Sequence, residues 1–145
     1  MKKKLVSVLL SMAMVATMAG GAFAEDAANA DLADKKVGVC IYQFSDNFMT
    51  LFRTELQDYL VSLGFSADNI TIQDGANDQA TQSQQIDAFI ADGVDVLIVN
   101  PVNASSSETI TDKVVDAGIP LVYINREPSE DEEKRWEDNS WDVAT

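Results

Sequence analysis

The residues best suited to chemistry follow the first apolar run of the chain, in the segment 41–49, IYQFSDNFM. Here Asp46 supplies a carboxylate, with the aromatic rings of Phe44 and Phe48 two residues to either side. A neutral sugar needs this combination, because its C–H face stacks on a ring while its hydroxyls bond planar polar groups. Asn100, at the end of another apolar run, offers an amide of the same kind. These residues could together hold a carbohydrate.

Each of these residues also has a purely structural interpretation. Ser45, Asp46 and Asn47 are all favoured N-cap residues, and any of them could accept from the first N–H groups of a helix that begins near Phe48. The ring of Phe48 is explained equally well by core packing in the first helical turn. Asn100 precedes a proline and is a turn residue if no ligand is assumed. A helix that starts here favours ionised Asp46 through its dipole, so cap and ligand roles both stay open.

Alternating apolar and helical patterns predict the elements that position these residues. Short apolar runs, typical of strands buried on both faces, alternate with helical patterns that end at glycine or alanine. The expected strands are 36–42, 69–75, 94–100 and 119–125, and the expected helices are 48–63, 78–92 and 105–117. This alternation predicts an α/β fold, an open parallel sheet with helices on both faces and strand order 2-1-3-4. A ligand crevice then opens beyond the carboxyl ends of the first and third strands, beside Asp46 and Asn100.

Local patterns add detail to this fold. The first helix has an apolar stripe expected to pack on the sheet, made of Phe48, Phe52, Leu56, Leu60 and Leu63. Ser105 and Glu108 have the spacing of a capping box at the start of the third helix. The acidic tail 126–145 is expected to be poor in strands and to contain an amphipathic connecting helix, with Trp136 and Trp141 outside the site.

The N-terminus has the pattern of an export signal. Lys2, Lys3 and Lys4 precede an uncharged run over 5–21, and residues 22–24 (AFA) supply a small-x-small cleavage motif. The alternative, an uncleaved membrane anchor, is disfavoured by that motif. We expect 1–24 to be a removable signal peptide, 25–34 a disordered lead-in and 35–145 a single incomplete lobe. The expected location is therefore the periplasm or another extracytoplasmic space.

Composition and spacing exclude several classes of function. Removal of the three signal lysines takes the formal charge from -14 to -17, which disfavours nucleic acid and anionic lipid as partners. The chain has no histidine and one cysteine, Cys40, expected to be buried, so a zinc site or a Ser-His or Cys-His pair is excluded. The glycines match neither a dinucleotide fingerprint nor a phosphate loop, and no two carboxylates pair convincingly as in a glycosidase. Binding is therefore favoured over catalysis.

The segments 37–49, 77–106 and 118–129 together resemble the N-terminal lobe of periplasmic sugar-binding proteins of ABC transporters, most of all the galactose/glucose-binding type. The resemblance implies a two-lobed clamp that closes on a monosaccharide about a hinge. It implies that Asp46 bonds a sugar hydroxyl, that Phe48 stacks on the sugar face and that Asn100 bonds a further hydroxyl. Tyr42 matches an aromatic residue that lines the cleft, and 125–127 match a turn beside it.

The same resemblance implies partners: a monosaccharide such as galactose or glucose, an ABC-transporter permease and a chemoreceptor, with the protein a monomer. Proteins of this type continue into a C-terminal lobe, which carries further sugar ligands and a calcium loop. Within 35–145 we therefore expect no cofactor and no metal, weak or absent sugar binding by the lobe alone, and an unpaired sheet edge. The alternatives are an exported α/β enzyme or signalling domain that uses Asp46, and, less favoured, a repressor core.

Overall fold

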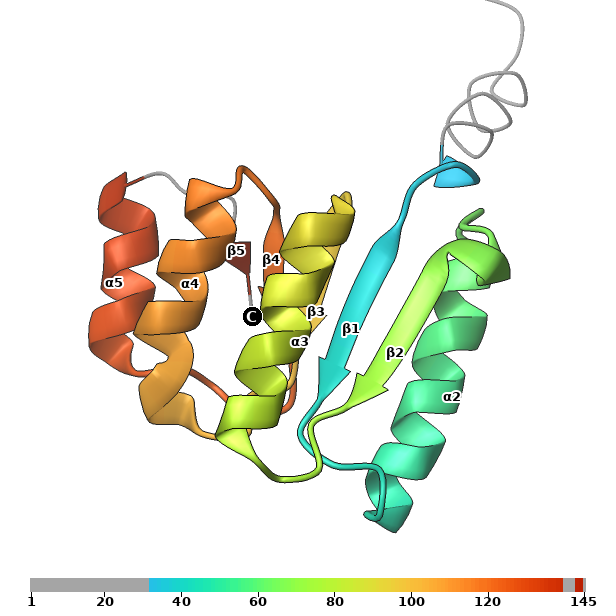
Figure 1. Ribbon diagram of the computed structural model, residues 1–145, viewed down its shortest axis with the longest axis horizontal. Helices are drawn as coiled ribbons and strands as arrows, with labels where there is room; N and C mark the ends of the chain where they lie inside the picture. Colours follow the sequence, from blue (N-terminus) through green and yellow to red (C-terminus); the bar gives the residue numbers. More distant parts are fainter. Residues whose placement is uncertain (1–31, 140–142, 145) are drawn as a thin grey trace, which may run out of the picture.

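A computed structural model describes residues 32–139 and 143–144. The predicted signal peptide, most of the predicted lead-in and Trp141 lie outside the described residues. No helix within the described ranges is long and apolar enough to cross a membrane. The described chain forms a parallel sheet with helices on both of its faces, as the alternating sequence pattern predicts (Figure 1).

The sheet has five strands in the order β2-β1-β3-β4-β5, and all four pairings are parallel. The strands are β1 (Val37–Ile41), β2 (Ile70–Asp74), β3 (Val96–Val99), β4 (Leu121–Tyr123) and β5 (Val143–Ala144). The predicted order 2-1-3-4 is confirmed. β4 does not form the edge of the sheet, because Val143 and Ala144 pair with Leu121 and Val122; the edge on this side is the two-residue β5.

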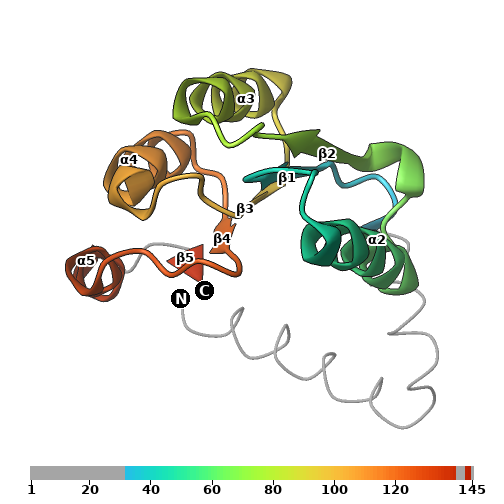
Figure 2. The same cartoon turned by 90° about the horizontal axis from the view of Figure 1, so that it is seen from below.

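The helices lie in two layers, with α2 on one face of the sheet and α3 and α4 on the other (Figure 2). Their bounds are α2 (Asn47–Ser62), α3 (Gln79–Asp92), α4 (Ser107–Asp116) and α5 (Glu130–Asn139), with short 3-10 turns η1 (Ala67–Asn69) and η2 (Ala104–Ser106). The right-handed crossover rule explains this division. The connection β1 to β2 runs in one direction across the sheet, and the other three connections run in the opposite direction.

Each face of the sheet has its own hydrophobic cluster, because successive strand residues point to opposite sides. Under α3 and α4 the cluster contains Cys40, Leu97, Val99, Leu121 and Tyr123, and it includes Trp136 of α5. The ring of Trp136 stacks on Tyr123, with centroids 5.6 Å apart. The expected tail helix therefore exists, but it is a packed element rather than only a solvated connection. Cys40 is buried as expected, and burial raises the pKa of its thiol to about 12.

Beneath α2 the second cluster contains Val37, Val39, Ile41, Met49 and Leu60. Of two local predictions on these helices, one is partly correct and one is wrong. Phe52, Leu56 and Leu60 of the predicted α2 stripe pack in this cluster, but only Leu60 is buried, and Phe48 is 59 % exposed. The predicted capping box is absent, because the side chain of Asn103 accepts from Ser105 N and the N-cap Ser106 makes no side-chain cap bond.

Glycine is required in the middle of β1. A Cβ atom on Gly38 would lie 2.9 Å from the ring of Phe89 in α3 and 3.0 Å from Leu97. The absence of a side chain therefore lets α3 approach the centre of the sheet closely. This close packing sets the position of α3, whose N-terminus lies at the carboxyl edge of the strands (Figure 1).

Candidate functional site

Asp46 is the N-cap of α2, as the sequence allowed. Its Oδ1 accepts hydrogen bonds from Phe48 N at 2.7 Å and Met49 N at 3.3 Å, which satisfies two of the free donors at the helix start. Its Oδ2 accepts from the hydroxyl of Tyr42 at 2.6 Å. The Tyr42 hydroxyl and the two backbone N–H groups lower the pKa of Asp46 below its usual range, so the carboxylate is ionised at neutral pH.

Tyr42 is the residue on which three loops converge. It follows β1, is only 8 % exposed, and its carbonyl accepts from Asn77 N in the loop after β2. The guanidinium of Arg126, in the loop after β4, lies 4.0 Å from the centre of the Tyr42 ring, within cation–π range. Arg126 also donates to the carbonyls of Pro101 at 3.1 Å and Val102 at 2.6 Å, in the loop after β3.

Asn100 directly follows β3 and is completely buried. Its Nδ2 lies 3.1 Å from the sulfur of Met49, so its side chain reaches the first turn of α2, which Asp46 caps. Its Oδ1 has no hydrogen-bond partner within residues 32–139 and 143–144. A buried carbonyl oxygen without a donor is costly, and such groups call for an explanation. The loops after β1 and β3 therefore meet at one edge, as the expected strand order requires.

Three glutamines on α3 hold the loops of this edge, and the sequence interpretation did not identify them. Gln79 accepts from Asn103 N; Gln82, buried, donates to Asn100 O and accepts from Val102 N; Gln85 donates to Asp74 O. Their spacing of three residues places them on one side of the helix. That regular spacing of amides in QATQSQQ was the signal available in the sequence.

The loops at this edge adopt conformations that ordinary residues rarely take. Ala76, Asn77 and Asn125 have positive φ values of 52°, 53° and 63°, and they follow β2 and β4. A Cβ atom on Gly75 would lie 2.9 Å from the carbonyl oxygen of Ile41. Such strained or tightly approached backbone collects at functional sites, where the surrounding contacts hold it in place.

The two candidate stacking rings lie in different environments. Phe48 is exposed, with its ring centroid 6.0 Å from that of Phe52 in the next turn of α2. Phe44 is half-buried, and the guanidinium of Arg53 covers one face of its ring at 3.9 Å. Phe48 therefore keeps more ring surface available than Phe44.

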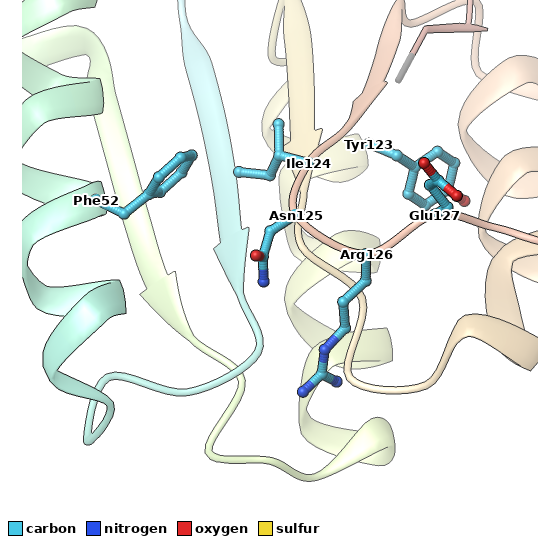
Figure 3. A pocket seen from close by; sticks show the side chains of 6 residues that line it. All are labelled: Phe52, Tyr123, Ile124, Asn125, Arg126 and Glu127. Carbon is cyan, nitrogen blue, oxygen red and sulfur yellow. The ribbon is translucent and has the colours of Figure 1, made fainter.

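A pocket of about 450 Å³ lies between α2 and the carboxyl end of β4. Its lining is Phe52, Tyr123, Ile124, Asn125, Arg126 and Glu127. Figure 3 shows Phe52 and Ile124 pointing toward one another, while Asn125 and Arg126 extend past the end of the strand. The polar end of this pocket thus adjoins the edge that carries Tyr42 and Asp46, through the Arg126 guanidinium.

These groups are suited to binding. Asp46 is occupied by three donors, and no group of three His, Cys, Asp or Glu side chains in the described residues could hold a metal. An ionised carboxylate, a guanidinium and amides provide acceptors and donors in fixed positions, which is what hydroxyl recognition needs.

The chain matches the family model of the periplasmic binding protein domain over residues 37–137. It belongs to the periplasmic binding protein family. A Rhizobium meliloti protein named for rhizopine binding is 44 % identical over 92 residues, which cover 63 % of this chain and 29 % of that protein. The D-galactose/methyl-galactoside binding periplasmic protein of Haemophilus influenzae is 32 % identical over 128 residues, covering 88 % of this chain and 36 % of its own.

Solved structures agree with this family. An ABC transporter solute binding protein of Bacillus halodurans, with bound myo-inositol, has a TM-score of 0.61 and 33 % identity, over 70 % of this chain and 35 % of that one. The chain thus spans about a third of the length of the relatives it matches. These relatives are solute-binding proteins rather than enzymes, which confirms the preference for binding over catalysis.

The names and titles of these relatives refer to the compounds that those proteins bind, D-galactose and myo-inositol among them. They do not single out galactose or glucose, because the names and titles of the relatives include rhizopine, myo-inositol, xylitol and ribose. The individual site residues and the domain boundaries remain predictions.

Proposed function

We propose that residues 35–145 form the N-terminal lobe of an extracytoplasmic solute-binding protein, which contacts one side of a monosaccharide such as galactose or glucose and serves an ABC-transporter permease. The observation that carries the proposal is that Asp46, after β1, and Arg126, after β4, both contact the side chain of Tyr42, while Arg126 also bonds the loop after β3. Residues 1–24 are then the signal peptide, the protein is a monomer, and a chemoreceptor is a second partner of its closed form.

In this proposal Asp46 accepts a sugar hydroxyl with the lone pairs that its three donors leave unused. Phe48 stacks on the sugar face with its exposed ring, and Tyr42 fixes the carboxylate. Asn100 accepts a further hydroxyl at its unpartnered Oδ1, after a small movement of the residues that bury it. Asn125 and Arg126 adjoin this group and are further candidates for polar contacts.

The experiment is a titration of the purified chain with galactose, glucose, ribose and myo-inositol, followed by NMR shifts of backbone amides. We expect weak binding with shifts confined to the loops at Tyr42, Asp46, Phe48 and Asn100. Weak binding is expected because one lobe supplies only part of the contacts that a closed clamp supplies. Shifts centred between α3 and α4, with any of the four ligands, would refute the proposal.

A matched pair of variants separates the cap from the site. Asp46→Asn keeps a favoured N-cap residue but removes the charge, so α2 should remain folded while ligand affinity falls by roughly tenfold or more. Asp78→Asn makes the same change at the N-cap of α3, where the side chain accepts from Thr81 N. If the two variants changed ligand affinity equally, Asp46 would serve only as the N-cap of α2.

A further inference from the structure

The loop after β3, residues 100–102, has a hydrogen-bond partner for every backbone polar group. Gln82 of α3 donates to the carbonyl of Asn100 and accepts from the N–H of Val102, both at 2.9 Å. Arg126 donates to the other two carbonyls, and the N–H of Asn100 donates to β1. The middle residue of the loop is proline, which has no N–H to satisfy. Gln82 therefore bonds the loop on both sides of this proline.

Gln82 occupies a position on α3 that suits an apolar side chain. The buried residues of this helix are Gln82, Ile86 and Phe89, so the amide continues a stripe that is otherwise apolar. Gln82 is completely buried. Burial of an amide costs free energy unless its donor and its acceptor are both bonded, and in Gln82 both are bonded to the loop. The loop, rather than the core, accounts for glutamine at this position.

The side chain of Asn100 is held in an arrangement that is unfavourable in the absence of a ligand. It is completely buried, its Nδ2 lies 3.1 Å from the sulfur of Met49, and its Oδ1 has no partner in the part of the chain that the structure describes. A free loop would relieve this cost by turning the amide toward water. The bonds to the carbonyl and the N–H of Asn100 fix the backbone on both sides of its Cα atom, which opposes that rotation.

We infer that Gln82 is a positioning residue for ligand recognition. It does not contact the ligand but holds Asn100, so that Oδ1 stays without a donor until a ligand group supplies one. An amide oxygen only accepts, so that ligand group is a hydroxyl or an N–H. An acceptor that is already in place reduces the ordering cost of binding. The inference rests on the proposed function, in which Asn100 contacts the ligand.

The test measures hydrogen exchange of side-chain NH2 groups by NMR, with no sugar present. In the unaltered chain the NH2 group of the buried Asn100 should exchange at least tenfold more slowly than that of the exposed Asn77, because exchange then requires local opening. Gln82→Met removes both bonds to the loop and keeps a side chain of similar size. Gln79→Met is the matched control, because Gln79 bonds the same loop only at Asn103 N, at 3.1 Å.

We expect Gln82→Met to speed exchange at the Asn100 NH2 group and at Val102 N by roughly tenfold or more. Gln79→Met should speed exchange at Asn103 N and leave the Asn100 NH2 group slow. The amide of Leu97, which donates to Pro120 O within the sheet, reports global opening in each variant. Circular dichroism and cooperative urea unfolding confirm that the variants fold. If Gln82→Met does not fold, the comparison of Asn100 with Asn77 in the unaltered chain decides the outcome.

A second arm titrates the same chains with galactose, glucose, ribose and myo-inositol. A sugar that shifts the amides near Asp46 should also shift the Asn100 NH2 group, and Gln82→Met should weaken its binding by roughly tenfold, the value of one lost hydrogen bond. Gln79→Met should weaken it less. Sugar-induced shifts between α3 and α4 would refute the proposed function, whereas the exchange arm needs no sugar and tests Gln82 by itself.

Three results would overturn the inference. Exchange of the Asn100 NH2 group as fast as that of Asn77 in the unaltered chain would show that Asn100 is not held. Slow exchange of the same group in folded Gln82→Met would show that Gln82 does not hold it. Unchanged sugar affinity in a Gln82→Met chain with a freely exchanging Asn100 would show that the position of Asn100 does not matter for binding.

Discussion

The two faces of the sheet are built from the same strands but are buried to very different extents. Leu97 and Leu121 point toward α3 and α4 and are at most 1 % exposed, whereas Val122 and Ile124 point toward the α2 side and are only partly buried. The residue types on the two sides are alike, so hydrophobicity did not produce the difference. The direction of each crossover decided it, because three of the four connections place their helices on one face.

The faces also differ in how they contribute to the crevice. The α3 side holds the loops through amides, with the buried Gln82 bonded to the backbone of Asn100 and Val102. The α2 side provides a charged group, the carboxylate of Asp46, and its hydrogen-bond donor Tyr42. One side therefore fixes the backbone of the edge, while the other presents side chains that can contact a ligand.

The largest expected effect is the loss of a fully buried leucine from the covered face. Leu97→Ala should lower the free energy of unfolding by about 2–5 kcal/mol, because it removes apolar contacts and leaves a cavity. Ile124→Ala, on the α2 side of the sheet, should cost less than about 1 kcal/mol, since its side chain is already partly in water. Urea unfolding of both variants measures this contrast. Equal costs would show that the two faces are equally packed.

A smaller effect is expected where α3 approaches β1. Gly38→Ala should destabilise the chain by about 1–3 kcal/mol, because its Cβ atom would press on the Phe89 ring at 2.9 Å. Thermal unfolding measures the cost. In the double variant with Phe89→Leu the two costs should not add, since a smaller side chain leaves room for the methyl group. Simple additivity would mean that the contact is not the cause.

Low pH should destabilise the folded protein, because carboxylates on both faces of the sheet become protonated. The pKa values of Asp46 and Asp78 lie below the ordinary 3.8, the first through Tyr42 and the second through Thr81 N. A lowered folded-state pKa gives stability that is complete above the unfolded pKa and is lost as the pH falls through the folded one. The contribution of these two carboxylates to the free energy of unfolding should therefore be constant from about pH 5 to 8 and should decline below about pH 4.

The same pH profile can assign the decline to either face. Asp46→Asn and Asp78→Asn keep a favoured N-cap residue but cannot titrate, so each should make the decline below about pH 4 shallower. Denaturant unfolding between pH 2.5 and 7 gives the profile. A decline that is unchanged in both variants would mean that other carboxylates, such as Asp95 bonded to Lys36 N, are responsible.

The smallest effect is expected on the exposed surface of α2. Leu51 is 61 % exposed, so Leu51→Ala should change the free energy of unfolding by less than about 0.5 kcal/mol. Urea unfolding beside Leu97→Ala provides the scale. A cost of several kcal/mol would show that Leu51 is covered in solution, and would move the boundary between the exposed and packed sides of α2.

Several features of the fold followed from local sequence, but their packing partners did not. The strands and the N-cap at Asp46 were predictable because apolar runs and capping residues act over a few positions. The α2 stripe was only partly correct, since an amphipathic pattern cannot say which of its flanks will find a neighbour. The two-residue strand β5 was missed because a segment this short has no pattern of its own and is defined by its pairing with β4.

For the site, the sequence by itself determined the chemistry of the groups at the strand ends: a carboxylate, rings and amides that follow buried strands. Only the tertiary structure decided which of these groups contact one another, because Arg126 joins Tyr42 to the loop after β3, and these residues are far apart in the chain. The tertiary structure likewise decided that half of one sheet face stays open. Crossover direction is a property of the whole sheet, and no single segment of sequence contains it.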